Sequence, residues 1–171
     1  YLPPMSVQEH KGGAPVTARV FVLTVSDTRT RETDASGAAI QRLLEAAGHV
    51  ISGRQLVRDE PAEVQRITRA QLDGAEAQVV ITTGGTGITS RDTTYEALSG
   101  LLQKRLDGFG ELFRMLSFQE IGSAAMLSRA TAGIAAGKIL FILPGSENAV
   151  QLAMTKLILP ELGHLLREVA R

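Results

Sequence analysis

The sequence predicts an α/β fold, a three-layer α/β/α sandwich with a mostly parallel central sheet. Apolar segments of strand length alternate along the chain with amphipathic segments of helix length, and this order produces parallel strands connected by helices. The 171 residues are enough for one domain with a sizeable core, and no internal repeat divides them. We therefore expect a single domain over residues 18–171.

The first half of this domain is expected to begin with two strands and two helices. Residues 19–25 form an apolar, β-branched strand, and residues 36–47 form a helix that ends before Gly48, a residue suited to left-handed backbone. Residues 50–57 form the second strand. Pro61 then opens a helix, because the N–H group that proline lacks would have no partner in the first turn.

The second half is expected to continue this alternation. Residues 78–82 form the third strand and residues 138–143 form the last one. Ser146 is suited to cap a long final helix, which Pro160 is expected to kink or restart. Between these strands, residues 109–121 form a helix whose inward face consists of Leu112, Phe113, Leu116 and Ile121.

The segment before the domain, residues 1–17, is expected to be a flexible arm, since most of its residues are polar, glycine or proline. Met5 is interpreted as the natural start, which makes residues 1–4 an expression remnant. The N-terminus lacks a signal-peptide pattern, and no apolar run reaches the roughly 18 residues of a membrane span. We therefore expect a cytoplasmic protein.

Composition excludes several classes of function. Lys plus Arg and Asp plus Glu both number 18, so no excess of charge favours binding to nucleic acid or to an acidic membrane. The absence of cysteine excludes disulfides, thiolate zinc sites, iron–sulfur clusters and cysteine nucleophiles. The three histidines are far apart and lack metal-ligand spacing, which argues against a histidine-based metal site.

The Gly-rich turn, Gly-Gly-Thr-Gly at residues 84–87, follows the third strand and is the strongest functional signal. Glycine permits positive φ angles and close approach, so successive backbone N–H groups can point at one phosphate oxygen. The turn is not a Walker A loop, since Ile-Thr rather than Lys-Ser or Lys-Thr follows it, and its spacing does not fit the dinucleotide fingerprint. The alternative is a tight turn without a ligand.

The helix expected after this turn adds the positive end of its dipole as a second anion-binding feature. Thr93 and Glu96 have the spacing of a capping box, in which each side chain accepts a hydrogen bond from a backbone N–H of the other. Asp92 precedes them. It could hold a metal ion against a phosphate, or it could only stabilise the helix N-terminus.

Four loops are expected to converge at one edge of the sheet, because ligands in such folds lie beyond the carboxyl ends of the strands. These loops cover residues 26–34, 58–60, 83–92 and 144–146. Phosphate-binding groups and carboxylates would therefore meet in one cleft. The side chains concerned are Ser26, Asp27, Asp59, Glu60, Thr86, Arg91, Asp92 and Ser146.

Several blocks resemble the molybdenum cofactor biosynthesis family of the MogA and MoaB type, which is related to the G domain of gephyrin. The pattern Thr-Thr-Gly-Gly-Thr-Gly, three residues, Arg-Asp-x-Thr-x-Glu-Ala over residues 82–97 is similar to the signature of this family. The likeness runs from about residue 18 to the C-terminus, and residues 109–122 resemble the MoaB branch more than the MogA branch. The other matching blocks are residues 22–29, 34–37, 109–118 and 143–146.

The resemblance implies a molybdopterin adenylyltransferase, which uses ATP and magnesium to adenylylate molybdopterin and releases pyrophosphate. It implies that Asp59 and Asp92 are catalytic and organise magnesium and the reacting phosphates. It also implies a homo-oligomer, with a hexamer favoured over a trimer. The residues expected to bind the substrates are Ser26, Asp27, Thr83, Gly84, Gly85, Thr86, Gly87, Arg91, Pro144, Gly145 and Ser146.

Other interpretations of these residues stay open. Asp59 could serve the helix that follows it, although the cap position falls one residue later. Ser26, Asp27 and Arg29 could contact the pterin or the nucleotide, or they could form a solvated loop. The protein could also hold molybdopterin without turnover, as a carrier or scaffold, or use the fold for a different nucleotide reaction.

Two positions depart from the family pattern. Tyr95 stands where many members have proline, which is expected to change only the start of the helix. Glu147 stands where many relatives have a non-acidic residue, and its charge would weaken phosphate binding if it faces the ligand. Two further basic residues, Arg114 and Arg129, could reach a phosphate or pair with acidic residues, but they are expected to lie on the solvated surface.

Overall fold

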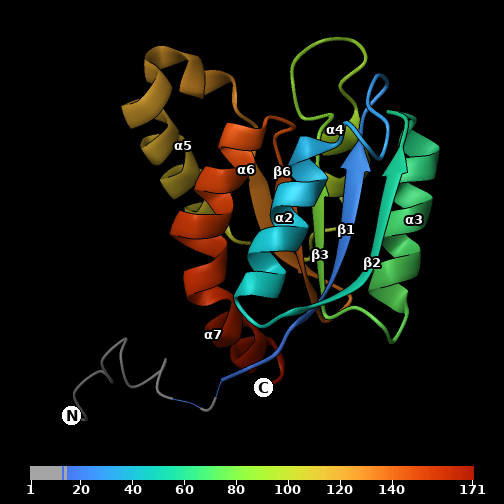
Figure 1. The fold of residues 1–171 in the computed structure, drawn as a ribbon, viewed down its shortest axis with the longest axis vertical. Coiled ribbons are helices and arrows are strands. Elements are labelled where there is room, and N and C mark those ends of the chain that lie inside the picture. The colour runs from blue at the N-terminus through green and yellow to red at the C-terminus, as the bar shows by residue number, and fades with distance from the viewer. Residues whose placement is uncertain (1–12, 14) are drawn as a thin grey trace.

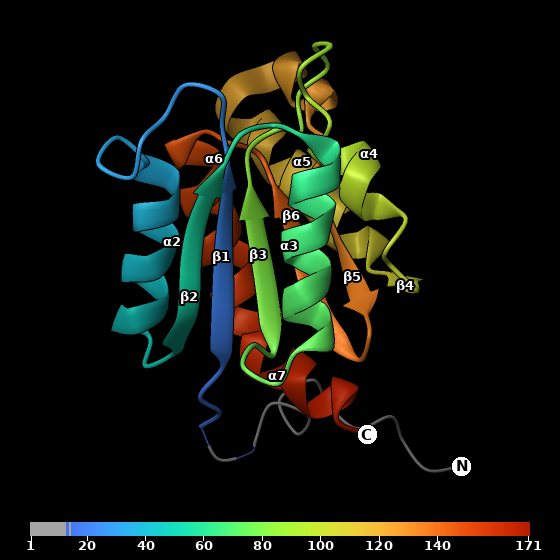
Figure 2. The ribbon, with the colours of Figure 1, turned by 90° about the vertical axis from the view of Figure 1, so that its right-hand side faces the viewer.

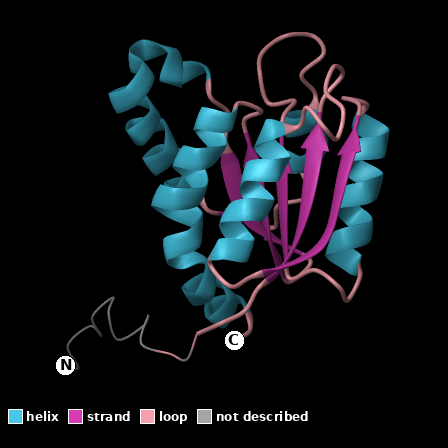
Figure 3. Ribbon diagram, viewed as in Figure 1, coloured by secondary structure: helices cyan, strands magenta, loops and turns pink. Residues whose placement is uncertain are grey.

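The computed structural model describes residue 13 and residues 15–171. At its centre is one sheet, with helices on either side of it (Figure 3). It has six strands, of which four neighbouring ones run parallel and the next two pair antiparallel. This confirms the predicted α/β fold with a mostly parallel sheet. In order across the sheet, the strands are β2 (Val50–Val57), β1 (Arg19–Val25), β3 (Val79–Thr83), β6 (Lys138–Leu143), β5 (Thr131–Ala135) and β4 (Lys104–Arg105).

Helices cover both faces of the sheet and complete the three-layer sandwich (Figure 1, Figure 2). One face carries α2 (Ala35–Ala46), α5 (Asp107–Ile121), α6 (Glu147–Ala153) and α7 (Leu159–Val169). The other face carries α3 (Pro61–Asp73) and α4 (Thr94–Ser99). Two shorter segments are the 3-10 helix η1 (Gly122–Leu127), after α5, and the π-helical turn η2 (Met154–Ile158), between α6 and α7.

Strand β1 shows how the sheet separates two apolar cores. Val20 and Val22 point toward the α2 and α6 side, whereas Phe21 and Leu23 point toward α3, because successive side chains of a strand alternate between its faces. All four side chains are buried. A parallel strand covered by helices on both faces is therefore apolar almost throughout, as this segment of the sequence is.

Several local signals of the sequence are confirmed. Gly48 follows α2 with a φ of +85°, and Pro61 occupies the first turn of α3. The Ser146 side chain accepts a hydrogen bond from the Ala149 N–H at 3.2 Å and so caps α6. The final helix is interrupted by η2 just before Pro160, which has no N–H group to continue the α-helical ladder.

The expectations for the segment between β3 and β6 are partly wrong. Strands β4 and β5 were not expected, because β5 reads Thr-Ala-Gly-Ile-Ala and lacks a β-branched apolar run. Leu112 and Ile121 were expected to face inward but are 48% and 60% exposed. Helix α5 buries Phe113 and Ser117 against the body of the protein, and its opposite face stays open.

Residues 1–12 and 14 of the expected flexible arm lie outside the described residues. Residues 15–17, which precede β1, belong to no helix or strand. Within the described part of the chain, no helix combines the length and the apolar character needed to cross a membrane.

Candidate functional site

The loops at the carboxyl ends of the parallel strands surround two adjoining cavities, which together we call the cleft. A cavity of about 260 Å³ lies between the loops after β1, β2 and β3, and one of about 380 Å³ lies between the Gly-rich turn, α5 and the loop after β6. Gly85, Asp92 and Gly145 line both cavities, and Glu147 lines neither. The other residues predicted for the site also line the cleft: Ser26, Asp27, Asp59, Thr83, Gly84 and Arg91 in the first cavity, and Thr86, Gly87, Pro144 and Ser146 in the second.

The Gly-rich turn has a conformation that requires glycine at two positions. Gly84 has a φ of +99° and Gly85 a φ of +71°. A Cβ atom on Gly84 would lie 2.0 Å from the Val25 carbonyl oxygen, and one on Gly85 would lie 2.0 Å from the Thr94 hydroxyl. The turn is therefore packed closely against β1 and against the start of α4.

The backbone N–H groups of the turn fall into two sets. Gly84 donates a hydrogen bond to the Leu143 carbonyl at 3.1 Å, which ties the turn to β6. In the part of the chain that the structure describes, no group accepts a hydrogen bond from the N–H of Gly85, Thr86 or Gly87. The Gly84 N–H is thus engaged with β6, and three N–H groups of the turn remain for an anion.

Two carboxylates lie beside these N–H groups. The Asp59 Oδ2 atom would be 2.7 Å from a Cβ atom on Gly85, and the Asp92 Oδ2 atom would be 2.5 Å from a Cβ atom on Gly87. Each carboxylate therefore occupies the space next to one glycine of the turn. Both carboxylates line the first cavity together with Gly85.

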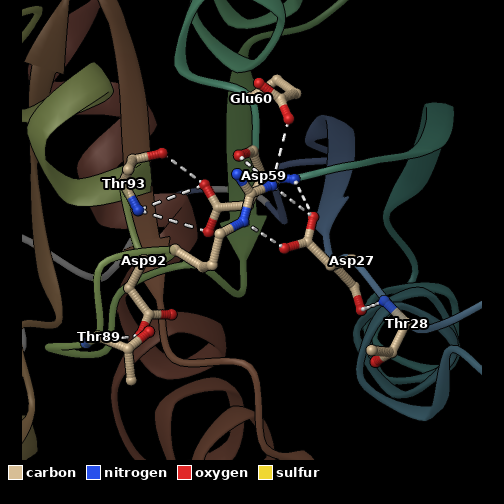
Figure 4. Close-up of polar contacts among 9 residues, drawn as sticks. Asp27, Thr28, Asp59, Glu60, Thr89, Asp92 and Thr93 are labelled. Atoms are coloured by element: carbon tan, nitrogen blue, oxygen red, sulfur yellow. Dashed lines mark hydrogen bonds and ion pairs between the residues drawn. The ribbon is translucent and has the colours of Figure 1, made fainter.

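Asp59 joins the loop after β2 to the start of α4 (Figure 4). Its Oδ1 atom accepts a hydrogen bond of 2.6 Å from the Thr93 hydroxyl, and both of its oxygens lie 3.3–3.4 Å from the Thr93 N–H. Glu96 pairs instead with Arg129. The predicted capping box between Thr93 and Glu96 is therefore wrong, because residues from other elements bind both side chains.

The surroundings of Asp59 raise the pKa of its carboxyl group. Burial is the main cause, since the residue is only 6% exposed and a charged carboxylate is disfavoured there. Hydrogen bonds from Thr93 act in the opposite direction, and the negative charges of Asp27 and Asp92 raise the pKa further. The cleft thus concentrates negative charge that a bound cation would offset.

Asp92 closes the segment between the Gly-rich turn and α4. Its Oδ2 atom accepts hydrogen bonds from the Thr89 N–H at 3.0 Å and from the Thr89 hydroxyl at 2.6 Å (Figure 4). The other oxygen, Oδ1, accepts no hydrogen bond from the described residues. Asp92 therefore binds the preceding loop rather than the first turn of α4, and one of its oxygens is available to a ligand.

Arg91 connects three loops at the rim of the first cavity. Its guanidinium donates to both carboxylate oxygens of Asp27, at 2.9 and 3.1 Å, to the Glu60 side chain at 3.2 Å and to the Asp59 carbonyl at 3.3 Å. The bonds from Arg91, together with the Asp59 N–H, lower the pKa of Asp27, and the same ion pairs raise the pKa of Arg91. A phosphate would have to compete with these carboxylates for Arg91.

The other predicted residues brace the loops that form the cleft. The Ser26 side chain accepts hydrogen bonds from the N–H groups of Thr28 and Arg29, at 3.2 and 3.0 Å. The Thr83 hydroxyl donates to the Pro144 carbonyl at 2.7 Å and joins the loops after β3 and β6. These contacts shape the walls of the cleft, and the ligand roles of the residues remain predictions.

Ser36, in the first turn of α2, was not among the predicted residues. Its hydroxyl donates to the Gly145 carbonyl at 2.6 Å and accepts a hydrogen bond from Arg29 at 2.9 Å. It thereby links the loops after β1 and β6. Its position in a helix start gave no signal of this role, because both partners come from other loops.

Arg129 was expected on the solvated surface but packs against the Gly-rich turn. Its Nε atom donates to the Thr86 carbonyl at 2.9 Å, its Nη2 atom donates to the Gly87 carbonyl, and its guanidinium also pairs with Glu96. The guanidinium lies 5.0 Å from the centre of the Tyr95 ring, so this tyrosine does more than change the start of α4. The carbonyl partners lie more than 40 residues away in sequence, which is why no local pattern indicated the contact.

The donor atoms of the cleft fit magnesium rather than a metal held by protein alone. Within the described residues, no group of three or more His, Asp or Glu side chains is placed to hold a metal ion. Magnesium, however, usually takes one or two carboxylates and completes its shell with water and substrate phosphates. Asp59 and Asp92 supply hard oxygen donors of that kind, next to N–H groups that suit a phosphate.

Comparisons with known proteins point to one family. Residues 21–164 match the family described as "Probable molybdopterin binding domain". The chain is 52% identical over 168 residues to molybdenum cofactor biosynthesis protein B of Halalkalibacterium halodurans, an alignment that covers 98% of this chain and 99% of the relative. A crystal structure of a molybdenum cofactor biosynthesis protein B has a TM-score of 0.89 and 51% identity over 93% of this chain and 99% of the other. The tungsten cofactor synthesizing protein MoaB from Pyrococcus furiosus has a TM-score of 0.81 and 38% identity, over 92% and 100% of the two chains.

Proposed function

The chain belongs to the molybdopterin-binding family of molybdenum cofactor biosynthesis proteins, and on this basis we propose that it adenylylates molybdopterin with MgATP. The terminal phosphate of molybdopterin attacks the α-phosphorus of ATP and forms a new P–O bond. The bond between the α-phosphorus and the pyrophosphate breaks in the same exchange. The products are adenylylated molybdopterin and pyrophosphate.

The observation that supports this proposal most is the position of two carboxylates beside the free N–H groups of the Gly-rich turn. The N–H groups alone would suit any phosphate, whereas Asp59 and Asp92 would repel one unless a cation lay between them. When bound there, magnesium would neutralise the charge of the reacting phosphates. Asp59 and Asp92 would hold it together with phosphate oxygens.

The two cavities of the cleft differ in a way that suits two substrates. The larger cavity has apolar walls from Phe113, Ile121 and Leu127, and we assign the flat pterin ring to it. The smaller cavity carries Asp27 and Arg91, and we assign the phosphates of ATP to it. In this assignment, the phosphates draw Arg91 away from Asp27, and the N–H groups at the junction of the cavities bind the terminal phosphate of molybdopterin.

The test is pyrophosphate release with ATP, magnesium and freshly prepared molybdopterin, for the wild-type protein and for Asp92→Asn. We expect release that requires the pterin and that falls about a hundredfold or more in the variant, because charge stabilisation by a metal site contributes several kcal/mol. Glu63→Gln is the matched control. Glu63 pairs with Arg66 on the exposed side of α3 and lies in neither cavity.

Two results would contradict the proposal in different ways. Full turnover by Asp92→Asn would remove Asp92 from the reaction while leaving the reaction itself in place. Tight molybdopterin binding without pyrophosphate release would identify a carrier or scaffold. The hydrogen bonds that Asp59 and Asp92 make to Thr93 and Thr89 would then be their whole function.

We also propose that the protein is a homo-oligomer, a hexamer rather than a trimer. Leu112, Met115 and Phe118 on α5 and Met126 and Leu127 on η1 are all 48–80% exposed, and an apolar face of this kind marks a protein contact. Sedimentation should show a hexamer that Phe118→Glu dissociates, whereas Val50→Glu, on the remote edge strand β2, should not. A stable wild-type monomer at micromolar concentration would contradict the assembly.

A further inference from the structure

A third cavity, which we call the arginine cavity, lies between the start of α4, β4, α5 and β5. It has a volume of about 270 Å³, and of its lining residues only Ser128 also lines the cleft. Its charged residues are three arginines and one aspartate: Arg105, Arg114, Arg129 and Asp107. The cavity is therefore separate from the cleft and has an excess of positive charge.

Arg114 is fixed in the wall of this cavity by backbone contacts alone. Its Nη1 atom donates to the carbonyls of Ala130, at 3.0 Å, and Ser128, at 3.5 Å. No carboxylate among the described residues pairs with it, and its Nε and Nη2 atoms donate to none of them. Gly110 makes room for this guanidinium, since a Cβ atom there would lie 2.6 Å from Nη2. Arg114 thus brings a half-buried positive charge and unused donors to the cavity.

Arg105 and Tyr95 add a second guanidinium and a hydroxyl group to the lining. The Nη2 atom of Arg105 donates to the Tyr95 hydroxyl oxygen at 2.8 Å, which leaves the tyrosine proton free to donate. Asp107 is the one acidic residue of the lining, and its carboxylate is 3.8 Å from the Arg105 Nε atom and 77% exposed at the rim. An exposed pair of this length is weak and leaves the charge of Arg105 largely uncompensated.

We propose that the arginine cavity is a second anion-binding site that takes a small phosphate anion, inorganic phosphate or pyrophosphate. Guanidinium groups keep their charge and bind phosphate oxygens through paired N–H donors, which gives strong and directional hydrogen bonds. The volume is slightly below the range of about 300–1,000 Å³ typical of small-molecule pockets, which favours a small anion over a whole nucleotide. Anion binding here does not require the proposed transferase activity.

Arg129 connects this site to the Gly-rich turn. It lines the arginine cavity, and the same guanidinium donates to the carbonyls of Thr86 and Gly87. An anion in the cavity would compete with these carbonyls, and with Glu96, for the donors of Arg129. Occupancy of the site and phosphate binding at the turn would therefore influence each other, and any such coupling acts equally in both directions.

Tyrosine fluorescence provides a local probe of this site. The chain contains no tryptophan and two tyrosines, Tyr1 and Tyr95, so in a Tyr1→Phe background the emission comes from Tyr95 alone. Titration with pyrophosphate, and separately with inorganic phosphate, at constant ionic strength should give a saturable change. Arg114→Gln should weaken the apparent affinity at least tenfold. Arg66→Gln, which removes one exposed positive charge from α3, should leave it unchanged.

Further variants decide where the signal arises. Asp92→Asn, which alters the cleft, should keep the change in Tyr95 emission, and a loss of the change in this variant would overturn the proposal. Arg105→Gln should also weaken anion binding. Because the Arg105 side chain is 43% exposed, this variant replaces Arg114→Gln in the test if Arg114→Gln does not fold. The absence of a saturable change, or wild-type affinity in both arginine variants, would overturn the proposal as well.

Discussion

The two sides of the Gly-rich turn carry opposite charges. On the cleft side, Asp59 and Asp92 lie beside Gly85 and Gly87, and the local negative charge contributes to the raised pKa of Asp59. On the other side, Arg129 donates to two carbonyls of the turn. The difference indicates that one set of residues fixes the backbone conformation of the turn and another set determines which ligand it can bind. The arginine holds the backbone in place, and the carboxylates determine what can accompany an anion at its free N–H groups.

The turn itself should give the largest effect, because both sides depend on its backbone. In Gly84→Ala, the new Cβ atom would lie 2.0 Å from the Val25 carbonyl oxygen, at a φ of +99°. Backbone strain and overpacking each cost about 1–3 kcal/mol, so we expect the free energy of unfolding to fall by about 2–6 kcal/mol. Urea unfolding of the variant and the wild type measures this loss.

Gly48→Ala is the matched control for this prediction. Gly48 also has a positive φ, +85°, but no atom lies within 4 Å of the position of a Cβ atom. Only the left-handed backbone is then penalised, by about 1–2 kcal/mol. If the two variants lost the same free energy of unfolding, the turn would have moved to accommodate the new Cβ atom of Gly84→Ala. Its close packing against β1 would then not determine its conformation.

The regular part of the fold could be predicted from the sequence, because its signals are local. The strand at residues 50–57 and the helix start at Pro61 agree with the structure, since strand composition and an N-terminal proline depend on near neighbours. Strand β5 and the orientation of α5 could not be predicted in this way. The pairing of β5 with β6 makes up for its weak composition, and the open face of α5 has an apolar pattern like that of a core helix.

The candidate site shows the same division. The loops at the carboxyl ends of the strands were expected to converge, and they do, because strand order alone brings them together. The partners within those loops were not predictable. Thr93 binds Asp59 instead of capping its own helix, and Arg129 reaches carbonyls of the Gly-rich turn. Both contacts join residues more than 30 positions apart, which no local pattern encodes.

Substitution of Arg129, the positively charged residue beside the Gly-rich turn, should have an effect of intermediate size. Arg129→Gln removes the guanidinium that donates to both carbonyls of the turn and leaves Glu96 without its positively charged partner. We expect the KM for molybdopterin to rise about tenfold, because a small displacement of a positioning group can cost up to a hundredfold. Hydrogen exchange at the Gly84 N–H, which donates to the Leu143 carbonyl, should become faster. Steady-state kinetics and exchange measured by mass spectrometry check both effects.

The kinetic effect must be separated from a general loss of stability. Arg66→Gln removes an exposed arginine that pairs with Glu63 on α3, and it should change neither KM nor exchange at the Gly84 N–H. Arg129→Lys keeps the charge with a single donor group and should restore part of the affinity. If Arg129→Gln lowered only the melting temperature and left KM and exchange unchanged, the positive side would have no part in holding the turn.

The smallest effect should come from two aspartates of the cleft whose pKa values shift in opposite directions. Hydrogen bonds from Arg91 and from a backbone N–H lower the pKa of Asp27 in the folded protein. Its carboxylate therefore stabilises the fold above the unfolded pKa of about 4, and this contribution disappears as the pH falls through the lower folded value. Burial raises the pKa of Asp59, so its ionisation destabilises the fold as the pH rises through that raised value.

Urea midpoints measured from about pH 3 to about pH 7 can separate these two contributions. As the pH rises, the urea midpoint of the wild type should increase relative to that of Asp27→Asn. Over the same interval, it should decrease relative to that of Asp59→Asn. If the two differences in urea midpoint, wild type minus each variant, changed with pH in the same direction, the two carboxylates would be in similar surroundings. The inference that the charge of Asp59 is unbalanced would then be wrong. Opposite slopes would show that Arg91 balances the charge of Asp27, whereas no positively charged side chain among the described residues balances that of Asp59. The Asp59 carboxylate is where the proposed function requires a cation.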